Sequence, residues 1–66
     1  MDVNKLKGYR TMAGLTQREM AKEIKMAEST YINKELGKSQ FSLEEARKIV
    51  AVLEKNKVKI TLEDFF

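Results

Sequence analysis

The chain consists of short apolar stripes at helical spacing, separated by residues that begin and end helices. The first stripe covers about residues 2–13 and is formed by Val3, Leu6, Tyr9 and either Met12 or Ala13. Gly14 follows at the position where a helix commonly ends in a left-handed residue. This pattern predicts one amphipathic helix that ends at Gly14.

A second helix is expected to begin after Thr16 and to end near Ile24. In the segment Thr16-Gln17-Arg18-Glu19, the Thr hydroxyl can accept a hydrogen bond from the amide of Glu19, and the Glu19 carboxylate can accept one from the amide of Thr16. Leu15 precedes this capping box and is placed to pack on Met20. The buried face is expected to be Met20, Ala21 and Ile24.

A third helix is expected over about residues 28–36, after a connection of only three residues, Lys25-Met26-Ala27. Helices joined by so short a turn cross steeply, at about 90–120°. Gly37 is placed to end this helix as Gly14 ends the first. The resulting helix-turn-helix unit covers about residues 16–36. The whole chain of 66 residues has the length of one domain.

The second half begins with a loop in which Phe41 is expected to anchor the chain to the core. Ser42-Leu43-Glu44-Glu45 is another capping box, and it opens a helix that reaches about Lys55, with Asn56 as its left-handed exit. The inward residues of this helix are expected to be Ala46, Ile49, Val50 and Leu53.

The last segment contains two short patterns. Residues 57–60 alternate between polar and apolar side chains, so a short strand and an extended connector both remain open. Residues 61–64 predict a final short turn of helix, after which Phe65 is expected to close the core, while Phe66 is assigned no role. Together these elements predict an all-α fold, a compact five-helix bundle with a central helix-turn-helix.

Composition excludes most catalytic and metal-binding chemistry. The chain has no Cys and no His, so it has no disulfide, no thiolate metal site and none of the most common general bases. Its acidic pairs, Glu44-Glu45 and Glu63-Asp64, lie at helix starts, where negative charge complements the helix dipole. We therefore expect no enzymatic activity, no cofactor, no metal and no small-molecule substrate.

Charge and hydropathy narrow the class of partner. No apolar run approaches the roughly 20 residues that span a membrane, and the N-terminus does not resemble a signal peptide, so a soluble cytoplasmic protein is expected. The net charge is +3; residues 1–38 contain eight Lys and Arg against five Asp and Glu, whereas residues 39–66 contain five of each. This asymmetry is consistent with a polyanionic partner and equally with a solvated surface of mixed charge.

The order of motifs between Leu15 and Gly37 resembles the phage repressor and Cro (XRE-type) helix-turn-helix family. The matching elements are Leu15-Thr16-Gln17, Met20-Ala21, the turn Lys25-Met26-Ala27, Ser29-Thr30 and Glu35-Leu36-Gly37. The likeness continues through the first helix, residues 37–46 and the final Leu62-Glu63-Asp64-Phe65-Phe66. It implies a lambda-repressor-like fold that binds double-stranded DNA and regulates transcription, as a repressor of phage, prophage or bacterial type.

In this family the N-terminal residues of the second helix of the unit read bases in the major groove. The resemblance therefore implies that Glu28, Ser29 and Asn33 read base edges, with Thr30 in a secondary role. Asn33 suits a bidentate contact with adenine, Ser29 suits several bases, and Glu28 suits cytosine although it repels phosphate. The simpler interpretation of these side chains is a solvated helix face.

The resemblance also assigns supporting roles. Gln17, Lys38 and Ser39 match phosphate contacts of the family, although Gln17 also suits a role at the start of its own helix. Arg10 and Glu35 match an ion pair that orients the reading helix and has a structural role. Further electrostatic candidates are Arg18, Lys22, Lys25 and Lys34.

Four residues depart from the family pattern. Lys25 stands where Gly is common, which costs roughly 1 kcal/mol if the residue is left-handed. Ala27 replaces a common Ser cap, and Lys34 replaces an apolar residue, so that its stem is expected to cover the core while its head reaches solvent. Ile32 replaces a polar residue and suits either a thymine methyl group or a protein partner.

Two further expectations concern assembly and function class. The resemblance implies a homodimer on a pseudo-palindromic operator with half-sites about one DNA turn (~34 Å) apart. Its dimer surface is expected near the loop after the third helix and the final segment. A protein-binding module on the same fold, as in an antirepressor or an antitoxin, stays open because the excess charge is low and because of Glu28 and Ile32.

Overall fold

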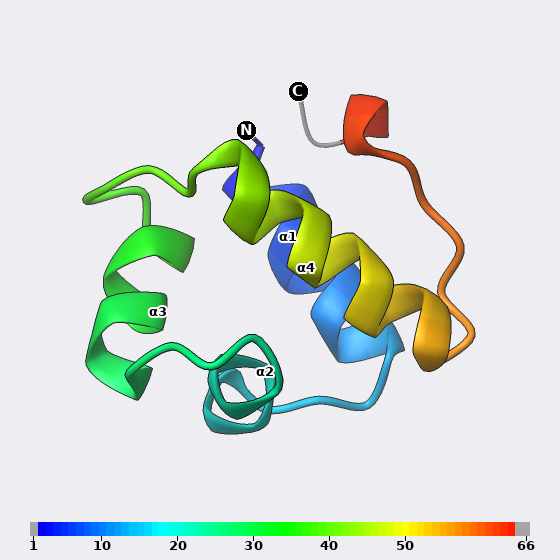
Figure 1. Cartoon of the computed structure of the whole chain (residues 1–66), viewed down its shortest axis with the longest axis horizontal. Helices are drawn as coiled ribbons and strands as arrows, with labels where there is room; N and C mark the ends of the chain where they lie inside the picture. Colours follow the sequence, from blue (N-terminus) through cyan, green and yellow to red (C-terminus); the bar gives the residue numbers. More distant parts are fainter. Residues whose placement is uncertain (1, 65–66) are drawn as a thin grey trace.

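The computed structural model describes residues 2–64, and the regular secondary structure over that range is entirely helical (Figure 1). Its elements are α1 (Val3–Met12), α2 (Gln17–Glu23), α3 (Glu28–Glu35), α4 (Leu43–Lys55) and the 3-10 turn η1 (Leu62–Asp64). The all-α prediction is confirmed for these residues, which form no strand. The prediction of five helices was wrong in its last member, because residues 62–64 form only one 3-10 turn, closed by a bond from the Asp64 amide to the Thr61 carbonyl (3.0 Å).

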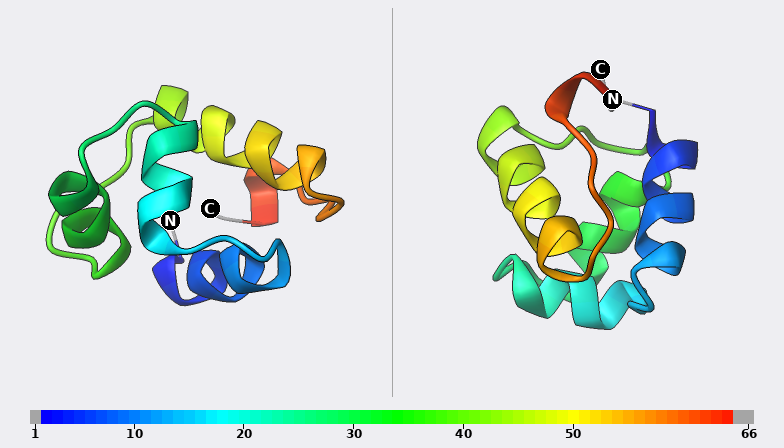
Figure 2. Two further views of the ribbon diagram at one scale, coloured as in Figure 1. Left: turned by 90° about the horizontal axis from the view of Figure 1, so that it is seen from below. Right: turned by 90° about the vertical axis from the view of Figure 1, so that its right-hand side faces the viewer.

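The four α-helices enclose one apolar core (Figure 2). α1 and α4 lie on opposite sides of the core, and α2 closes it below, while the segment after α4 returns between α1 and α4. The largest fully buried side chains come from all four helices and are Leu6, Met20, Tyr31, Ile49 and Leu53. Phe41 is also buried, which confirms its predicted role as the anchor of the loop before α4.

The two predicted capping boxes are both present. At α2, the Thr16 hydroxyl accepts from the Glu19 amide (3.0 Å) and the Glu19 carboxylate accepts from the Thr16 amide (2.9 Å). The equivalent bonds at α4 join Ser42 and Glu45, at 3.1 and 2.8 Å. These bonds satisfy amides that a helix leaves without partners at its first turn, and they fix where α2 and α4 begin.

All four α-helices end in the same hydrogen-bonded motif, in which a left-handed residue reverses the chain. Gly14 (φ +75°) and Gly37 (φ +84°) take that conformation after α1 and α3, as predicted. The prediction for Asn56 was wrong, because its φ is −98° and Lys57 (φ +66°) is the left-handed residue. Asn56 still belongs to the helical turn, since its side-chain amide and its backbone amide both donate to the Val52 carbonyl (2.8 and 3.1 Å).

Residues 57–60 do not form a strand, because Lys57 completes the turn after α4 and residues 58–60 form an irregular connector. The apolar members of its alternating pattern, Val58 and Ile60, are buried in the core. The connector that carries them runs between α1 and α4 (Figure 2). The segment therefore buries alternate side chains as a strand does, but it pairs with no strand among the described residues. The predicted core closure by Phe65 falls outside the described residues.

The inward faces of the helices largely match the prediction. Met20, Ala21 and Ile24 of α2 are buried, as are Ala46, Ile49 and Leu53 of α4. Val50 is only partly buried, and Val52 takes a core position instead. In α1 the stripe continues to the partly buried Ala13, whereas Met12 is 72% exposed.

Replacing Lys57 by Gly tests the strain at the end of α4. We expect Lys57→Gly to raise the free energy of unfolding by about 1 kcal/mol, because glycine adopts a left-handed backbone without the clash of a Cβ atom. Urea denaturation at constant ionic strength measures the change. Lys59→Gly is the matched control, since it removes the same charge from the same connector at a residue whose φ is not positive. Equal effects of the two substitutions would contradict the assignment of strain to Lys57.

Candidate nucleic-acid interface

The turn between α2 and α3 is tight and well defined. Lys25 is left-handed (φ +57°), and the Met26 amide donates to the Ala21 carbonyl at 2.8 Å, so α2 ends and the chain reverses within one residue. Figure 1 shows α2 almost end-on while α3 lies in the plane of the picture, so the two helices cross steeply. Ala21 is buried next to this turn, as predicted, and its small side chain leaves room for α3 to pack on α2.

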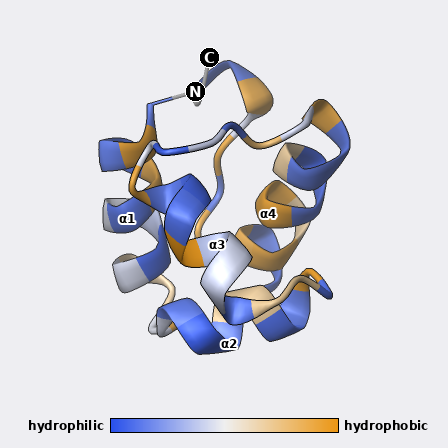
Figure 3. Cartoon of the chain, turned by 90° about the vertical axis from the view of Figure 1, so that its left-hand side faces the viewer, coloured by the Kyte–Doolittle hydropathy of each residue, from blue (hydrophilic) through white to orange (hydrophobic). Residues whose placement is uncertain are grey.

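The steep crossing leaves α3 at one side of the molecule. Tyr31 and Glu35 point into the body and are buried, whereas Ser29 and Asn33 are exposed. At 3.6 residues per turn, Ser29 and Asn33 lie on the side of α3 opposite to the buried pair. Figure 3 views this side and shows α3 nearest to the viewer. The outward face of α3 is therefore polar, accessible and uncharged at its centre.

The remaining predicted reading residues lie beside this face. Glu28 and Thr30 are exposed in the first turn of α3, and Ile32 is partly buried. Ala27 makes no side-chain hydrogen bond to the first turn, as its residue type predicted, and Glu28 supplies the acidic charge that complements the helix dipole there. The structure thus brings Glu28, Ser29, Thr30 and Asn33 together on one element.

A buried ion pair joins α1 to the end of α3. Arg10 Nε and a terminal guanidinium nitrogen donate to the two carboxylate oxygens of Glu35 at 2.9 and 3.2 Å. The side chains are only 10% and 3% exposed, respectively. Arg10 also donates to the backbone carbonyl of Leu15 at 2.7 Å, so the same guanidinium holds the segment that leads into α2.

Two further donors complete the environment of Glu35. The Tyr31 hydroxyl donates to one carboxylate oxygen (2.5 Å), and Gln17 Nε2 donates to the other (3.1 Å). Glu35 therefore receives hydrogen bonds from α1, α2 and its own helix. Sequence reasoning found Arg10 as the partner of Glu35 but missed Tyr31, although its position one turn before Glu35 on the same face carried the signal.

The electrostatics of this network follow from its geometry. Burial works against the ionised form of Glu35, but the hydrogen bonds from Arg10, Tyr31 and Gln17 outweigh it, so the pKa of Glu35 lies below its ordinary value. Burial, together with the bond to Glu35, raises the pKa of Tyr31. The hydrogen bond to Glu35 raises the pKa of Arg10 despite its burial. Near neutral pH the network is thus a carboxylate, a guanidinium and a neutral phenol.

Gln17 lies at the first turn of α2, partly buried beside Glu35. One N–H of its amide is used by Glu35, which fixes the orientation of the side chain and leaves the second N–H and the carbonyl for other partners. The role expected at the start of its own helix belongs instead to Thr16 and Glu19, which form the capping box there.

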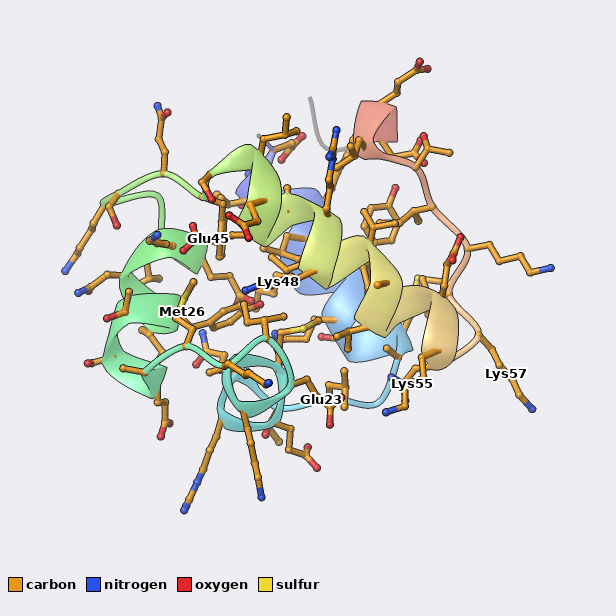
Figure 4. All side chains as sticks on the ribbon, in the orientation of Figure 1. Glu23, Met26, Glu45, Lys48, Lys55 and Lys57 are labelled. Atoms are coloured by element: carbon orange, nitrogen blue, oxygen red, sulfur yellow. The ribbon has the colours of Figure 1, made fainter. Side chains whose placement is uncertain are left out.

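Lys34 belongs to the body of the domain. Its Nζ donates to Glu45 Oε1 at 2.7 Å and lies 5.9 Å from the centre of the Phe41 ring. The prediction that the Lys34 ammonium group reaches solvent was wrong. Glu45, in the first turn of α4, faces α3 and forms an ion pair with Lys34 (Figure 4). Burial would raise the pKa of Glu45, but Lys34 and the Ser42 amide outweigh it and hold that pKa below its ordinary value.

The loop after α3 presents the predicted phosphate contacts. Lys38 and Ser39 are exposed directly after Gly37, at the C-terminal end of the outward helix. Arg18, Lys22 and Lys25 are exposed on α2 and the turn. Positive side chains therefore flank α3 on both sides, while α3 itself carries one lysine, which is paired with Glu45.

A tight turn, a steep crossing and an outward polar helix define a helix-turn-helix DNA-binding domain. Comparison with protein families agrees, because a family model described as Helix-turn-helix matches residues 6–60. The chain therefore belongs to the XRE-type (Cro/C1-like) helix-turn-helix family, a family of DNA-binding transcription regulators that bind double-stranded DNA. No curated protein and no solved structure matched the chain.

Residues 2–64 contain neither a membrane-spanning helix nor a metal-binding cluster. No helix in this range is long and apolar enough to cross a membrane. No group of three acidic side chains, or of other metal-binding side chains, is arranged there to hold a metal ion.

Replacing Tyr31 by Phe tests the network around Glu35. At pH 7 we expect Tyr31→Phe to lower the free energy of unfolding by about 1.5–3 kcal/mol, because a hydrogen bond to a buried carboxylate is lost. The pKa of Glu35 is lower in the folded than in the unfolded protein, so ionised Glu35 stabilises the fold at every pH above the ordinary pKa of Glu. This stabilisation is lost as the pH falls from that ordinary value through the lowered pKa. The loss should therefore shrink as the pH is lowered below about 4.3.

Urea denaturation of both proteins from pH 7 down to pH 3 measures this difference. A loss that stays constant over the whole range would contradict a contribution that depends on the ionised Glu35.

Proposed function

We propose that this protein binds double-stranded DNA in a sequence-specific manner and regulates transcription, as a repressor of phage or bacterial type that acts in the cytoplasm. The observation that carries the proposal is the outward face of α3, where Ser29 and Asn33 are exposed opposite the buried Tyr31 and Glu35. A polar helix face that is held rigidly outside the body fits the major groove, where each base pair has its own pattern of donors and acceptors.

In this proposal α3 reads the bases. Asn33 makes a bidentate contact with adenine, and Ser29 contacts a neighbouring base. Glu28 accepts from a cytosine amino group, and Thr30 supports these contacts from the flank. Support comes from the exposure of all four side chains on one short helix.

The phosphate contacts come from either side of α3. Gln17 donates its second amide N–H to a backbone phosphate, with its orientation fixed by Glu35. Lys38 and Ser39 contact phosphate from the loop after α3, where both are exposed. Such contacts set the register of the domain on the duplex and leave the sequence to α3.

The protein acts as a homodimer on a pseudo-palindromic operator whose half-sites lie about one turn of DNA (~34 Å) apart. The dimer surface lies near the loop after α3 and the final segment. As a repressor it excludes the polymerase by occupying its site. Selection of bound duplexes from a random pool tests binding, symmetry and half-site spacing together.

A second candidate function is a protein-binding module on the same fold. The exposed Leu36, the partly buried Ile32 and the acidic Glu28 on or beside α3 favour it. Salt dependence separates the two functions, since a DNA reader loses affinity with a slope of about −0.9 per phosphate contact in a plot of log K against log salt concentration. A flat dependence would favour a protein partner.

Replacing Asn33 by Ala tests base reading. On the selected duplex we expect Asn33→Ala to cost about 1–3 kcal/mol of binding free energy and to relax the preference at one base pair per half-site. Competition with single-base variants of the duplex measures both effects. Asn4→Ala, which truncates the same side chain at an exposed position of α1, is the control and should bind as the wild type does. An unchanged preference in Asn33→Ala would refute its role as a reader.

Replacing Lys38 by Ala tests phosphate contact. We expect Lys38→Ala to weaken binding to all duplexes alike and to reduce the salt slope by about one. Lys57→Ala is the matched control, because it removes the same charge at a position on the opposite side of the molecule from α3 (Figure 4). Equal slopes for the two variants would show that the charge acts only at long range.

A further inference from the structure

Leu36 is an exposed apolar side chain at the end of the reading helix. It follows α3 directly, it is 61% exposed, and its backbone is still helical (φ −77°, ψ −7°). At 3.6 residues per turn it lies within about 20° of Ser29 around the helix axis and about 60° from Asn33. Leu36 therefore continues the stripe formed by the proposed reading residues.

The direction of the side chain strengthens this placement. Cα–Cβ bonds in a helix tilt toward its N-terminus, so the Leu36 side chain leans over the turn that carries Asn33. Directly after Leu36 the chain reverses at Gly37 (φ +84°) and continues to the exposed Lys38. Leu36 thus lies between the proposed base contacts and a proposed phosphate contact.

We propose that Leu36 contacts the C5 methyl group of a thymine and so selects thymine at one position of each half-site. The thymine methyl is the apolar group that base edges present in the major groove. Packing a leucine on it removes apolar surface of both groups from water. Any other base would place a polar edge against the leucine and leave that edge without a hydrogen-bond partner. This inference rests on the proposed function.

The structure favours Leu36 over the residue that the sequence suggested for this contact. Ile32 is partly buried, whereas Leu36 is mostly in solvent. The other large apolar side chains that are strongly exposed in the described part of the chain, Met12 and Leu43, belong to α1 and α4. Leu36 is thus the exposed apolar group that continues the proposed contact surface.

A double-mutant cycle between the protein and the DNA tests the contact. The probe is the duplex recovered by selection, in which each thymine is replaced in turn by deoxyuridine, which lacks only the methyl group. At one thymine per half-site we expect deoxyuridine to weaken wild-type binding about three- to five-fold. Leu36→Ala should bind the thymine duplex more weakly by a similar factor and show no further loss with deoxyuridine at that position.

Met12→Ala is the matched control, because it truncates a side chain that is 72% exposed at the end of α1, outside the stripe on α3. It should keep the full wild-type sensitivity to deoxyuridine. Fluorescence anisotropy titrations at one salt concentration measure all affinities. Retained binding of Leu36→Ala to the deoxyuridine duplex also shows that the variant is folded.

The outcomes separate this inference from the function on which it rests. If the wild type and Leu36→Ala lose the same factor at every thymine, or if no thymine is sensitive in the wild type, the contact with Leu36 is refuted while DNA binding stands. If the wild type binds no duplex in preference to others, the proposed function itself is refuted and the inference falls with it.

Discussion

The buried pair of Arg10 and Glu35 is the interaction on which the position of α3 depends. Glu35 is the last residue of α3, and its two carboxylate oxygens accept hydrogen bonds from Arg10 of α1 and Gln17 of α2. Removing one partner of such a pair costs about 3–5 kcal/mol, because it leaves an unpaired charge in the interior. A domain of 66 residues has only a small core with which to offset that loss. The angle at which α3 projects from the body is thus tied to the stability of the whole fold.

Much of this fold is predictable because its signals are local. The capping boxes at Thr16 and Ser42 and the left-handed residues Gly14 and Gly37 each need only a few neighbouring residues to form, and all four are found where the sequence places them. The error at Asn56 is local as well. Asn is the better left-handed residue of the two by type, but the side-chain and backbone amides of Asn56 both bond to the Val52 carbonyl of the preceding turn, and the reversal falls on Lys57.

The site was predictable to a lesser extent, because its details depend on contacts between distant segments. Arg10 and Glu35 were found through a family resemblance, since nothing in the spacing of residues 25 apart indicates a contact. The bond from Gln17 to Glu35 and the pairing of Lys34 with Glu45 depend on how α2, α3 and α4 pack. The outward residues of α3 were also given by the family resemblance, and the structure places Ser29 and Asn33 outward because Tyr31 and Glu35 pack into the body on the other side of the helix.

The distribution of charge indicates that different elements supply affinity and selectivity at the proposed interface. On α3, Glu35 is neutralised by Arg10, and Lys34 by Glu45, which leaves Glu28 as the charged side chain of that helix outside these pairs. α3 therefore carries no net positive charge, and in the proposed complex the attraction to phosphate comes from α2, the turn and the loop after α3. Because phosphate contacts supply affinity without sequence information, this separation leaves the selectivity of α3 to hydrogen bonds and apolar contact. It also limits the affinity expected of a single domain, so the second copy that we propose on a symmetric site would add phosphate contacts that one domain lacks.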